Sequence, residues 1–415
     1  MPNEADYRVV RDENVLRFQS LSSPFVVANF IRAIFHGRQS GITHFLLDFA
    51  AIQGAYPNVV APVAGLLEMY RSEEQLSFEI LDSPDFLGRT CIFNPAIAGL
   101  DLGDSLTPMN VVWKFATPNE INQLVNAYIT DVARAVECKI GVLQGLEWCL
   151  NEVMDNILQH SLATHGYAMG QIHPSSQHIA LCIFDHGRGL YNSLKATVHQ
   201  PSNAVEAIKL AVQEGVTRDK NIGQGNGMWG LQNIVMSNSG FLNITSGPGF
   251  VGRRNTELNT SLQVPFPSYS NNCTTVDFQI DFDKEVSIVD ALGGYQPINQ
   301  RIENLEDDFN NIIYRVSDQP SGSGTRKSGV LLRNELLNIK NESNSLIQID
   351  FSGLSVIASS FADELVGKLI LICSSQEFER RFKIVGANET ILAIINRSVT
   401  QRIRDGMTDD SEATS

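Results

Sequence analysis

Short apolar runs alternate with helix-like stretches along the first part of the chain. Residues 43–52 form an apolar run typical of a buried strand, residues 59–74 have helical spacing, and residues 76–81 predict another strand. Strands that alternate with helices favour an α/β layer. We therefore expect a small α/β domain over residues 1–90.

The order of elements changes in the middle of the chain. The elements expected there are a strand at 110–116, helices at about 118–137 and 141–160, and strands near 177–185, 240–246 and 258–264. Two helices followed by strands indicate one mixed sheet that is covered by helices on one face. This pattern predicts a second domain over residues 107–267.

The chain after this domain divides into three parts. Residues 265–273 are polar and contain prolines, which is typical of a linker. Another α/β pattern occupies residues 276–400. Residues 401–415 are polar and acidic, and we expect this tail to be disordered.

Two segments of the chain resemble each other. Residues 45–58 align with residues 346–360, with Asp48 on Asp350, and each segment precedes a helix and a similar strand. A duplicated domain explains this similarity, and chance similarity of two apolar strand–loop–helix units is the alternative.

Composition and charge narrow the classes of function. The chain has 415 residues, of which 43% are hydrophobic and 19% are charged, so it has enough apolar material for several buried cores. The net charge of −15, without a cluster of Lys and Arg, argues against nucleic acid as a partner. The six cysteines are too far apart for a small disulfide framework or a zinc site.

The sequence also bears on location. The N-terminus is charged and does not resemble a signal peptide, and no apolar run is long enough for a membrane helix. We therefore expect a cytoplasmic protein with reduced thiols and no membrane partner.

A helical stretch at 146–161 carries the first candidate chemistry. Glu152 and Asn156 are four residues apart, so they lie on one face of this helix, opposite an apolar stripe. An amide oxygen is a suitable ligand for Mg²⁺, and a carboxylate can orient or deprotonate an attacking group. For this helix alone, an ordinary amphipathic helix is the alternative.

The second candidate is a predicted strand that runs into a glycine-rich turn. Asp185 stands at the end of the strand, where its carboxylate can accept a hydrogen bond from an exocyclic amine such as that of adenine. Gly187 and Gly189 allow the backbone to pass close to a ligand. A strand that merely ends in a glycine turn is the alternative.

The third candidate is a glycine-rich segment before an apolar helix. Its glycines are Gly223, Gly225, Gly227 and Gly230. Successive backbone N–H groups and a helix N-terminus can hold phosphates. The last three glycines also match the dinucleotide fingerprint, but neither a preceding strand nor a following acidic residue is present, so that interpretation fails.

Together, in this order, the three segments resemble the GHKL ATPase superfamily, which includes gyrase-type, chaperone and mismatch-repair ATPases, histidine kinases and anti-sigma-factor kinases. NEVMDN (151–156) is similar to the N-box of the superfamily, DHGRG (185–189) to its first glycine box and GQGNGMWGL (223–231) to its second. A hydroxyl residue on a late strand usually supports the adenine-binding aspartate. Thr260 matches it, although Asn259 replaces the usual glycine.

The resemblance implies a role for each residue of the first two motifs. Glu152 would be the catalytic base or would orient water, and Asn156 would bind Mg²⁺. Asp185 would bind the adenine amine, while Gly187 and Gly189 would line the base pocket. ATP and Mg²⁺ are therefore the cofactors that the resemblance implies.

The resemblance also implies a phosphate site and a lid. The phosphates would be held by Gly223, Gly225, Gly227 and Gly230. The segment 190–224 would be the ATP lid, and it contains Arg218 and Lys220 as candidate ligands of the γ-phosphate. A solvated loop is the alternative for these two cations. Gln159 departs from histidine kinases, which often have a lysine at this position.

Residues 345–369 resemble the STAS-like domains of anti-sigma-factor antagonists, and residues 1–90 resemble a diverged copy. The expected fold class is therefore α/β, with a two-layer α+β ATPase domain flanked by two small α/β domains. In the resembled antagonists a serine at the position of Ser359 or Ser360 accepts phosphate. Ser360 also fits the N-cap of a helix over 361–372, and we favour this interpretation.

Three functions are consistent with these features. The first is a Mg²⁺-dependent ATP-binding regulatory switch, an ATPase that acts through its STAS-like domains on a protein partner. The second is an anti-sigma-type serine kinase, or a related histidine-kinase-like protein, that phosphorylates a STAS partner. The third is a non-catalytic scaffold. The sequence does not decide between ATPase and protein kinase, and it leaves a homodimer open.

Overall fold

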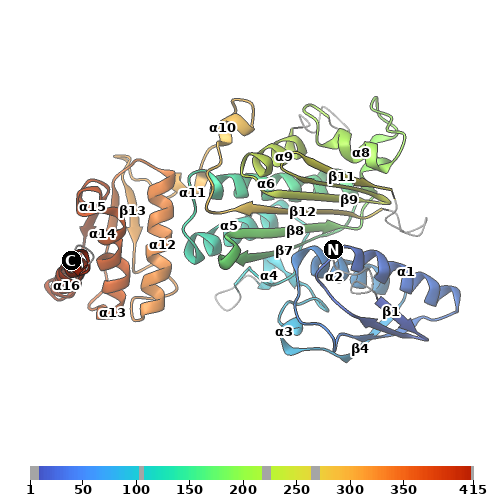
Figure 1. The fold of residues 1–415 in the computed structure, drawn as a ribbon, viewed down its shortest axis with the longest axis horizontal. Helices are drawn as coiled ribbons and strands as arrows, with labels where there is room; N and C mark the ends of the chain where they lie inside the picture. The colour runs from blue at the N-terminus through green and yellow to red at the C-terminus, as the bar shows by residue number, and fades with distance from the viewer. Residues whose placement is uncertain (1–8, 102–106, 217–225, 263–271, 413–415) are drawn as a thin grey trace. The chain divides into compact units, whose positions relative to one another are not determined.

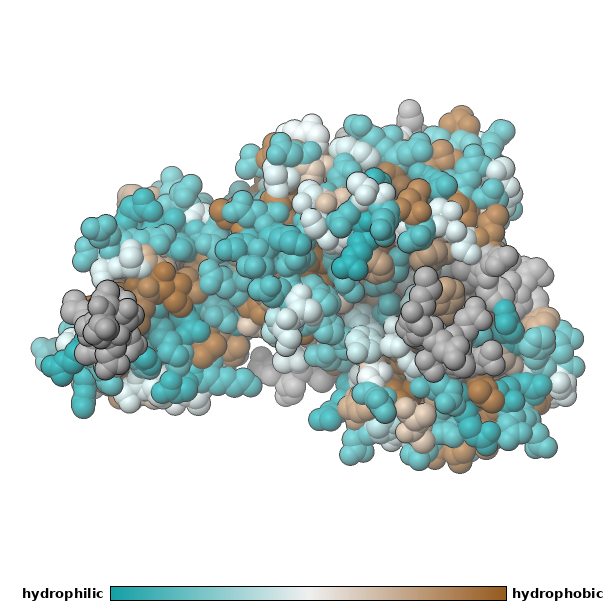
Figure 2. All heavy atoms as spheres, in the orientation of Figure 1, coloured by the Kyte–Doolittle hydropathy of each residue, from teal (hydrophilic) through white to brown (hydrophobic). Residues whose placement is uncertain are grey.

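The computed structural model describes residues 9–101, 107–216, 226–262 and 272–412 (Figure 1), and the remaining residues are grey in the space-filling view (Figure 2). The chain is of the mixed α/β class, as the sequence predicts. It forms two compact units. Unit 1 comprises residues 1–131, 144–282 and 286–295, and unit 2 comprises residues 132–143, 283–285 and 296–415. No helix among the described residues is long and apolar enough to cross a membrane.

Unit 1 begins with a small sheet of four strands. In spatial order these are β1 (Val9–Asp12), β2 (Val15–Phe18), β3 (His44–Asp48) and β4 (Ser77–Asp82). The first two strands form a hairpin, and the other neighbours are parallel. The parallel strands are connected by two helices, α1 (Phe25–Gln39) and α2 (Pro57–Ser72). Two short helices follow, α3 (Asp85–Gly88) and α4 (Ala98–Asp101).

A larger sheet of eight strands forms the rest of unit 1, in the order β11-β10-β9-β12-β8-β7-β6-β5. Its strands are β5 (Ala96–Ile97), β6 (Trp113–Phe115), β7 (Gly166–His173), β8 (His178–Asp185), β9 (Phe241–Ser246), β10 (Gly249–Arg254), β11 (Glu257–Ser261) and β12 (Thr274–Asp281). All neighbours are antiparallel except β5 and β6.

The position of β12 corrects a predicted domain boundary. The sequence places residues after 276 in the C-terminal domain, but β12 lies between β9 and β8 in the larger sheet. Most of the predicted linker, 265–273, lies outside the described residues. The alternation of the apolar residues Val276, Phe278 and Ile280 with polar neighbours is the local signal for this strand.

Helices lie along both faces of the larger sheet, whereas the sequence predicts one covered face. In Figure 1, α6 and α9 lie on one side of the sheet and α2 on the other. The helices of unit 1 that follow α4 are α5 (Pro118–Ala135), whose last turn belongs to unit 2, α6 (Val142–Asn156), a π-helical turn (Ile157–Ser161), a 3₁₀ turn (Pro174–Ser176), α7 (Gly189–Leu194), α8 (Ala204–Ala211), α9 (Gly227–Ser237) and α10 (Ile288–Ala291).

Helix α2 covers the second face because it is apolar on nearly all sides. Twelve of its residues are buried, from Pro57 to Tyr70, as expected for a helix with a sheet on each side. Gly65 allows the close approach, since a Cβ atom there would lie 2.5 Å from the ring of Phe184 and 2.8 Å from that of Tyr167. One hydrophobic core therefore joins the predicted N-terminal domain to the predicted ATPase domain.

Unit 2 contains a parallel sheet of three strands, β13 (Ile312–Arg315), β14 (Ile347–Asp350) and β15 (Phe382–Val385). Its helices are α11 (Gln300–Glu303), α12 (Arg326–Glu342), α13 (Ser359–Ala362), a π-helical segment (Asp363–Gly367), α14 (Lys368–Cys373), α15 (Ser375–Arg381) and α16 (Glu389–Glu412). The expectation of a disordered tail from 401 onward is wrong as far as Glu412, because α16 continues to that residue.

The two small sheets share one order of elements and the same hydrogen bonds at the middle strand. In each unit a strand, a helix, a second strand, one or more helices and a third strand follow one another. Asp48 Oδ1 accepts a 3.0 Å bond from the N–H of Ala50, and Asp350 Oδ1 accepts a 2.8 Å bond from the N–H of Ser352. The sequence alignment of these two aspartates therefore corresponds to equivalent positions in the two folds.

The predicted role of Ser360 is wrong. Helix α13 begins at Ser359, its N-cap is Ala358, and no side chain caps it. Ser360 is therefore inside the first turn, where its hydroxyl does not replace the missing backbone acceptors.

Candidate functional site

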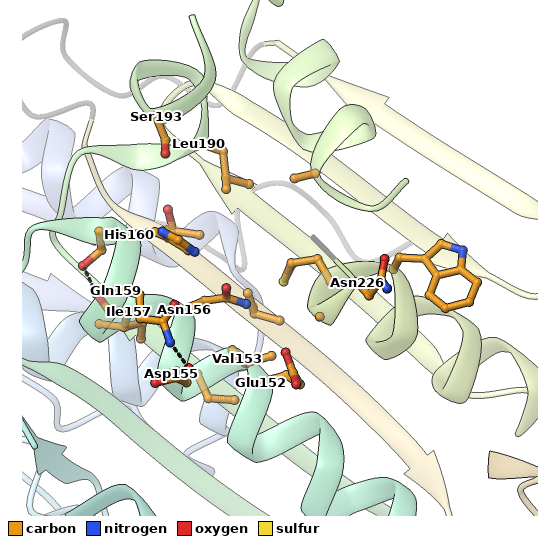
Figure 3. Close-up of a pocket in the computed structure, with 18 of the residues that line it drawn as sticks. Glu152, Val153, Asp155, Asn156, Ile157, Gln159, His160, Leu190, Ser193 and Asn226 are labelled. Atoms are coloured by element: carbon orange, nitrogen blue, oxygen red, sulfur yellow. Dashed lines mark hydrogen bonds between the residues drawn. The ribbon is translucent and has the colours of Figure 1, made fainter. Parts of the chain in front are cut away.

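A cavity of about 560 Å³ lies in unit 1 between the larger sheet and the helices on one of its faces. Its walls come from α6 and the π-helical turn, from β8 and β12, and from α7 and the start of α9 (Figure 3). A volume of this size lies within the range of roughly 300–1,000 Å³ that is usual for small-molecule sites.

Helix α6 brings the first two candidate residues to this cavity. Glu152 and Asn156 both line it, on the face of the helix that their spacing predicts. Burial raises the pKa of Glu152, and the negative charge of Asp155 raises it further. The side-chain amide nitrogen of Asn156 is buried without a hydrogen-bond partner among the described residues. A carboxylate of raised basicity and an unsatisfied amide are thus exposed to any ligand in the cavity.

Asp185 enters the same cavity from the end of β8. Its residue is 4% exposed, and its Oδ1 accepts a 2.8 Å hydrogen bond from the backbone N–H of Gly187. Burial raises the pKa of Asp185 to about 7, although hydrogen bonds from Gly187 and Ser161 act against this rise. A buried carboxyl at a strand end is suited to pair with a polar edge of a ligand.

The turn after Asp185 requires both of its glycines. A Cβ atom at Gly187 would lie 2.3 Å from the backbone oxygen of Ser161. Gly189 has a φ of +70°, in the left-handed region that favours glycine, and it lines the cavity. These two positions therefore have structural reasons to be glycine, independent of any ligand.

The start of α9 packs against the carboxylate of α6. A Cβ atom at Gly227 would lie 2.3 Å from Glu152 Oε2 and 3.4 Å from the Asn156 amide nitrogen. Gly230 is similarly restricted, because a Cβ atom there would lie 2.3 Å from the ring of Trp148. The helix N-terminus and the two polar residues of α6 are therefore adjacent.

The structure corrects the position of Thr260. This residue lies on the edge strand β11, it is exposed, and the strands β10, β9 and β12 separate it from β8. Thr274 on β12 pairs directly with Asp185 and lines the cavity. Its hydroxyl lies 3.1 Å from that of Ser246, which accepts a 2.8 Å bond from the N–H of Leu190.

The sequence did not identify Thr274 as a site residue, because it predicted no strand at β10 or at β12. The alternating pattern of residues 274–281 could have identified β12. Four other candidates, Arg218, Lys220, Gly223 and Gly225, lie outside the described residues. In its described part the predicted lid, 190–224, contains α7 and α8.

Large apolar side chains complete the cavity. They include Trp148, Trp229, Leu292 and Tyr295. Trp229 falls within the second glycine box, whereas the other three lie in no motif, and the last two fall in a segment that the sequence assigns to the C-terminal domain. Among the described residues, no three His, Cys, Asp or Glu side chains are grouped to hold a metal ion. A Mg²⁺ ion here would need oxygen ligands from a bound phosphate as well as from Asn156.

Comparisons with known proteins identify one part of the chain. The family model of a STAS-like domain of unknown function (DUF4325) matches residues 328–392, which extend from α12 into α16. Residues 328–392 are therefore STAS-like. No curated protein matches the chain.

Proposed function

We propose that unit 1 binds ATP with Mg²⁺ and that the chain is a nucleotide-dependent regulatory switch that acts on a protein partner through its STAS-like part. The observation that carries this proposal is the meeting of Glu152, Asn156, Asp185 and Gly227 around one cavity. These residues come from three separate motifs, and the order and spacing of the motifs are those of the GHKL ATPases.

The end of the cavity near Asp185 suits an adenine ring. Ile183 and Val276 are paired and provide apolar walls on the sheet, and the pair of Asp185 and Thr274, two residues along the same strands, provides polar groups beside them. Adenine presents an exocyclic amine that donates hydrogen bonds and flat faces that pack against apolar side chains. A carboxylate has about four acceptor positions, so Asp185 can accept from this amine in addition to Gly187 and Ser161.

The end near α9 suits a polyphosphate. The backbone N–H groups at the start of this helix, which is 11 residues long, favour an anion. Asn156 can supply one oxygen to Mg²⁺, and phosphates and waters can supply the others. Glu152 lies next to this helix end, where a carboxylate of raised pKa can orient or deprotonate a nucleophile.

A serine kinase is the second candidate function. Ser359 is exposed at the start of α13, and neither it nor Ser360 caps that helix. Because neither serine caps the helix, a capping role no longer argues against phosphorylation at this position. A scaffold without catalysis is a third candidate.

One experiment separates these functions. The full chain is incubated with γ-labelled ATP and Mg²⁺, and free phosphate and protein-bound label are measured together, with Glu152→Gln as the matched control. A switch with ATPase activity releases phosphate without labelling, and Glu152→Gln still binds ATP while its turnover drops by about 10²–10⁴-fold. Label on the protein instead favours the kinase.

Calorimetry with MgATP provides the test of binding. Binding that requires Mg²⁺ and weakens by roughly tenfold to a hundredfold in Asp185→Asn supports the proposal. Binding without turnover leaves the sensing form of the switch or the scaffold. No binding at millimolar MgATP contradicts the proposed function.

A further inference from the structure

The segment that leads from unit 1 into the C-terminal domain forms part of the cavity wall. It comprises residues 286–295 and includes α10, and we call it the strap. Leu292 and Tyr295 of the strap line the cavity. From residue 296 onward the chain belongs to unit 2. The strap thus lies between the candidate nucleotide site and the STAS-like domain along the chain.

The strap is held against the two helices that carry the candidate catalytic and phosphate-binding residues. Asn233 of α9 donates a 3.1 Å hydrogen bond to the backbone oxygen of Ala291. A Cβ atom at Gly145 of α6 would lie 3.1 Å from both Ile234 of α9 and Ile288 of the strap. The side chains of all three elements therefore meet at one position, and a shift of α9 relative to α6 has to move the strap.

Leu292 provides the most direct connection to the phosphate-binding turn. A Cβ atom at Gly230 would lie 2.7 Å from Leu292 Cδ2. Gly230 is one helical turn after Gly227, so Leu292 packs on the first turn of α9, which would receive the phosphates. Any rearrangement of this turn on ligand binding is transmitted to Leu292 by direct contact.

Tyr295 is a side chain whose contacts would increase if a ligand were bound in the cavity. It lines the cavity and is 62% exposed, so part of its ring is open to a bound molecule. The turn before it contains Gly293 and Gly294, both with positive φ, so the backbone there can adopt conformations that other residues rarely take. A bound molecule would give the ring a surface to cover.

We propose that the strap is a nucleotide sensor. Leu292 and Tyr295 contact the nucleotide or the turn that holds it. Nucleotide binding then orders the strap, which precedes the STAS-like domain along the chain. This inference rests on the proposed function, because it takes MgATP as the ligand. It adds a positioning segment that lies outside the three motifs and identifies the route by which occupancy of the site reaches the C-terminal domain.

The first test measures affinity for MgATP in the full chain. Tyr295→Ala removes the ring, and we expect it to weaken MgATP binding by roughly threefold to tenfold. Tyr295→Phe keeps the ring and should bind as the wild type does. The matched control is Val289→Ala, a residue of the same strap that is 40% exposed and does not line the cavity. Its affinity should stay within twofold of wild type.

The second test measures amide hydrogen exchange of residues 286–300 with and without MgATP. We expect slower exchange in the strap when MgATP is present, with no such change in Asp185→Asn at the same concentration. Leu292→Ala should reduce the protection even at saturating MgATP, because its contact with α9 is lost. If Leu292→Ala does not fold, Leu292→Met keeps an apolar contact of similar volume and should retain the protection.

The possible failures are distinguishable. If wild type does not bind MgATP, both the proposed function and the strap inference are wrong. If wild type binds MgATP but Tyr295→Ala has wild-type affinity and the strap shows no protection, the strap inference alone is wrong.

Discussion

At the scale of single residues, burial on the two faces of the larger sheet changes the acidity of two aspartates. Asp185 faces the cavity, and Asp277 lies on the opposite face below the start of α2. Burial raises the pKa of each to about 7. Asn58 and Asn243 donate bonds of 3.4 Å to Asp277 Oδ2, too long to offset the loss of hydration.

Asp277 makes a prediction about stability and pH. Since its folded pKa lies above the unfolded value of 3.8, its contribution to stability is fully present below about pH 4 and is lost as the pH rises through 7. Asp277→Asn removes this loss, and the new amide can donate to Asn58 Oδ1, which is buried without a partner among the described residues.

We therefore expect Asp277→Asn to raise the free energy of unfolding at pH 8 by about 1–4 kcal/mol relative to wild type. The gain should shrink as the pH falls toward 5. Urea unfolding at pH 5, 6.5 and 8 measures it, with the exposed Asp82→Asn as the control. A constant difference across this pH range would show that Asp277 does not titrate there.

The two candidate threonines make a second prediction at this scale. Thr274 pairs with Asp185 across the sheet, whereas Thr260 is on the distant edge strand. Thr274→Ala should weaken MgATP binding by roughly threefold to tenfold, the usual effect of one lost hydrogen bond. Thr260→Ala should leave it unchanged. Calorimetric titration of both variants decides, and the reverse result would restore the assignment of Thr260.

At the scale of elements, helix α2 packs against two sheets. It covers the small N-terminal sheet, and it also covers β7 and β8 of the larger one. A sheet with one open face would leave Tyr167 and Phe184 in water, although both are almost fully buried here. The hydrophobic effect therefore joins the two sheets through this helix.

Gly65 tests the close approach of α2 to the larger sheet. In an isolated helix, Gly→Ala stabilises by about 1 kcal/mol. Here the added Cβ would lie 2.5 Å from Phe184, so we expect Gly65→Ala to destabilise unit 1 by about 1–3 kcal/mol. Thermal or urea unfolding measures the sign. Gly88→Ala is the control, because a Cβ atom there would have no neighbour within 4 Å. A stabilised Gly65→Ala variant would contradict the packing described here.

At the scale of the whole molecule, neither unit is a continuous stretch of chain. The segment 132–143, which runs from the last turn of α5 to the start of α6, belongs to unit 2, where Asn338 binds its backbone. Asn338 donates to the oxygens of Ala133 and Val136, at 2.7 and 2.8 Å, and accepts from the N–H of Cys138 at 2.7 Å. Such a buried amide specifies one position for the segment, because each of its polar atoms has a partner.

A truncation tests the shared core of unit 1. A fragment that starts at residue 107 lacks α2 and exposes the apolar face of β7 and β8. We expect this fragment to aggregate or to melt well below the full chain, as measured by size-exclusion chromatography and circular dichroism. The comparison is a chain that ends at residue 404, since it keeps all of unit 1 and should melt as the full chain does. A soluble monomeric fragment with wild-type stability would show that the domains fold independently.

The local features of this protein follow from its sequence. Periodicity placed β3 and α6, whose buried positions repeat every two or about 3.6 residues, whereas α2 and β8 stood out as apolar runs that are buried on nearly all sides. The spacing of Glu152 and Asn156 placed them on one helical face, and glycine chemistry marked the turn after Asp185. The correspondence between Asp48 and Asp350 could also be recognised in the sequence, since each residue ends the middle strand of its own strand–helix–strand–helix–strand unit.

The tertiary structure alone decided which of these elements meet. Strand order depends on pairing between residues far apart in sequence, so Thr274 rather than Thr260 stands beside Asp185. An apolar helix does not show which surfaces will cover it, so the second partner of α2 was not predictable. For the same reason, the sequence did not show that the strap lines the cavity. Its apolar residues carry no motif, and only packing against α6 and α9 brings them to the site.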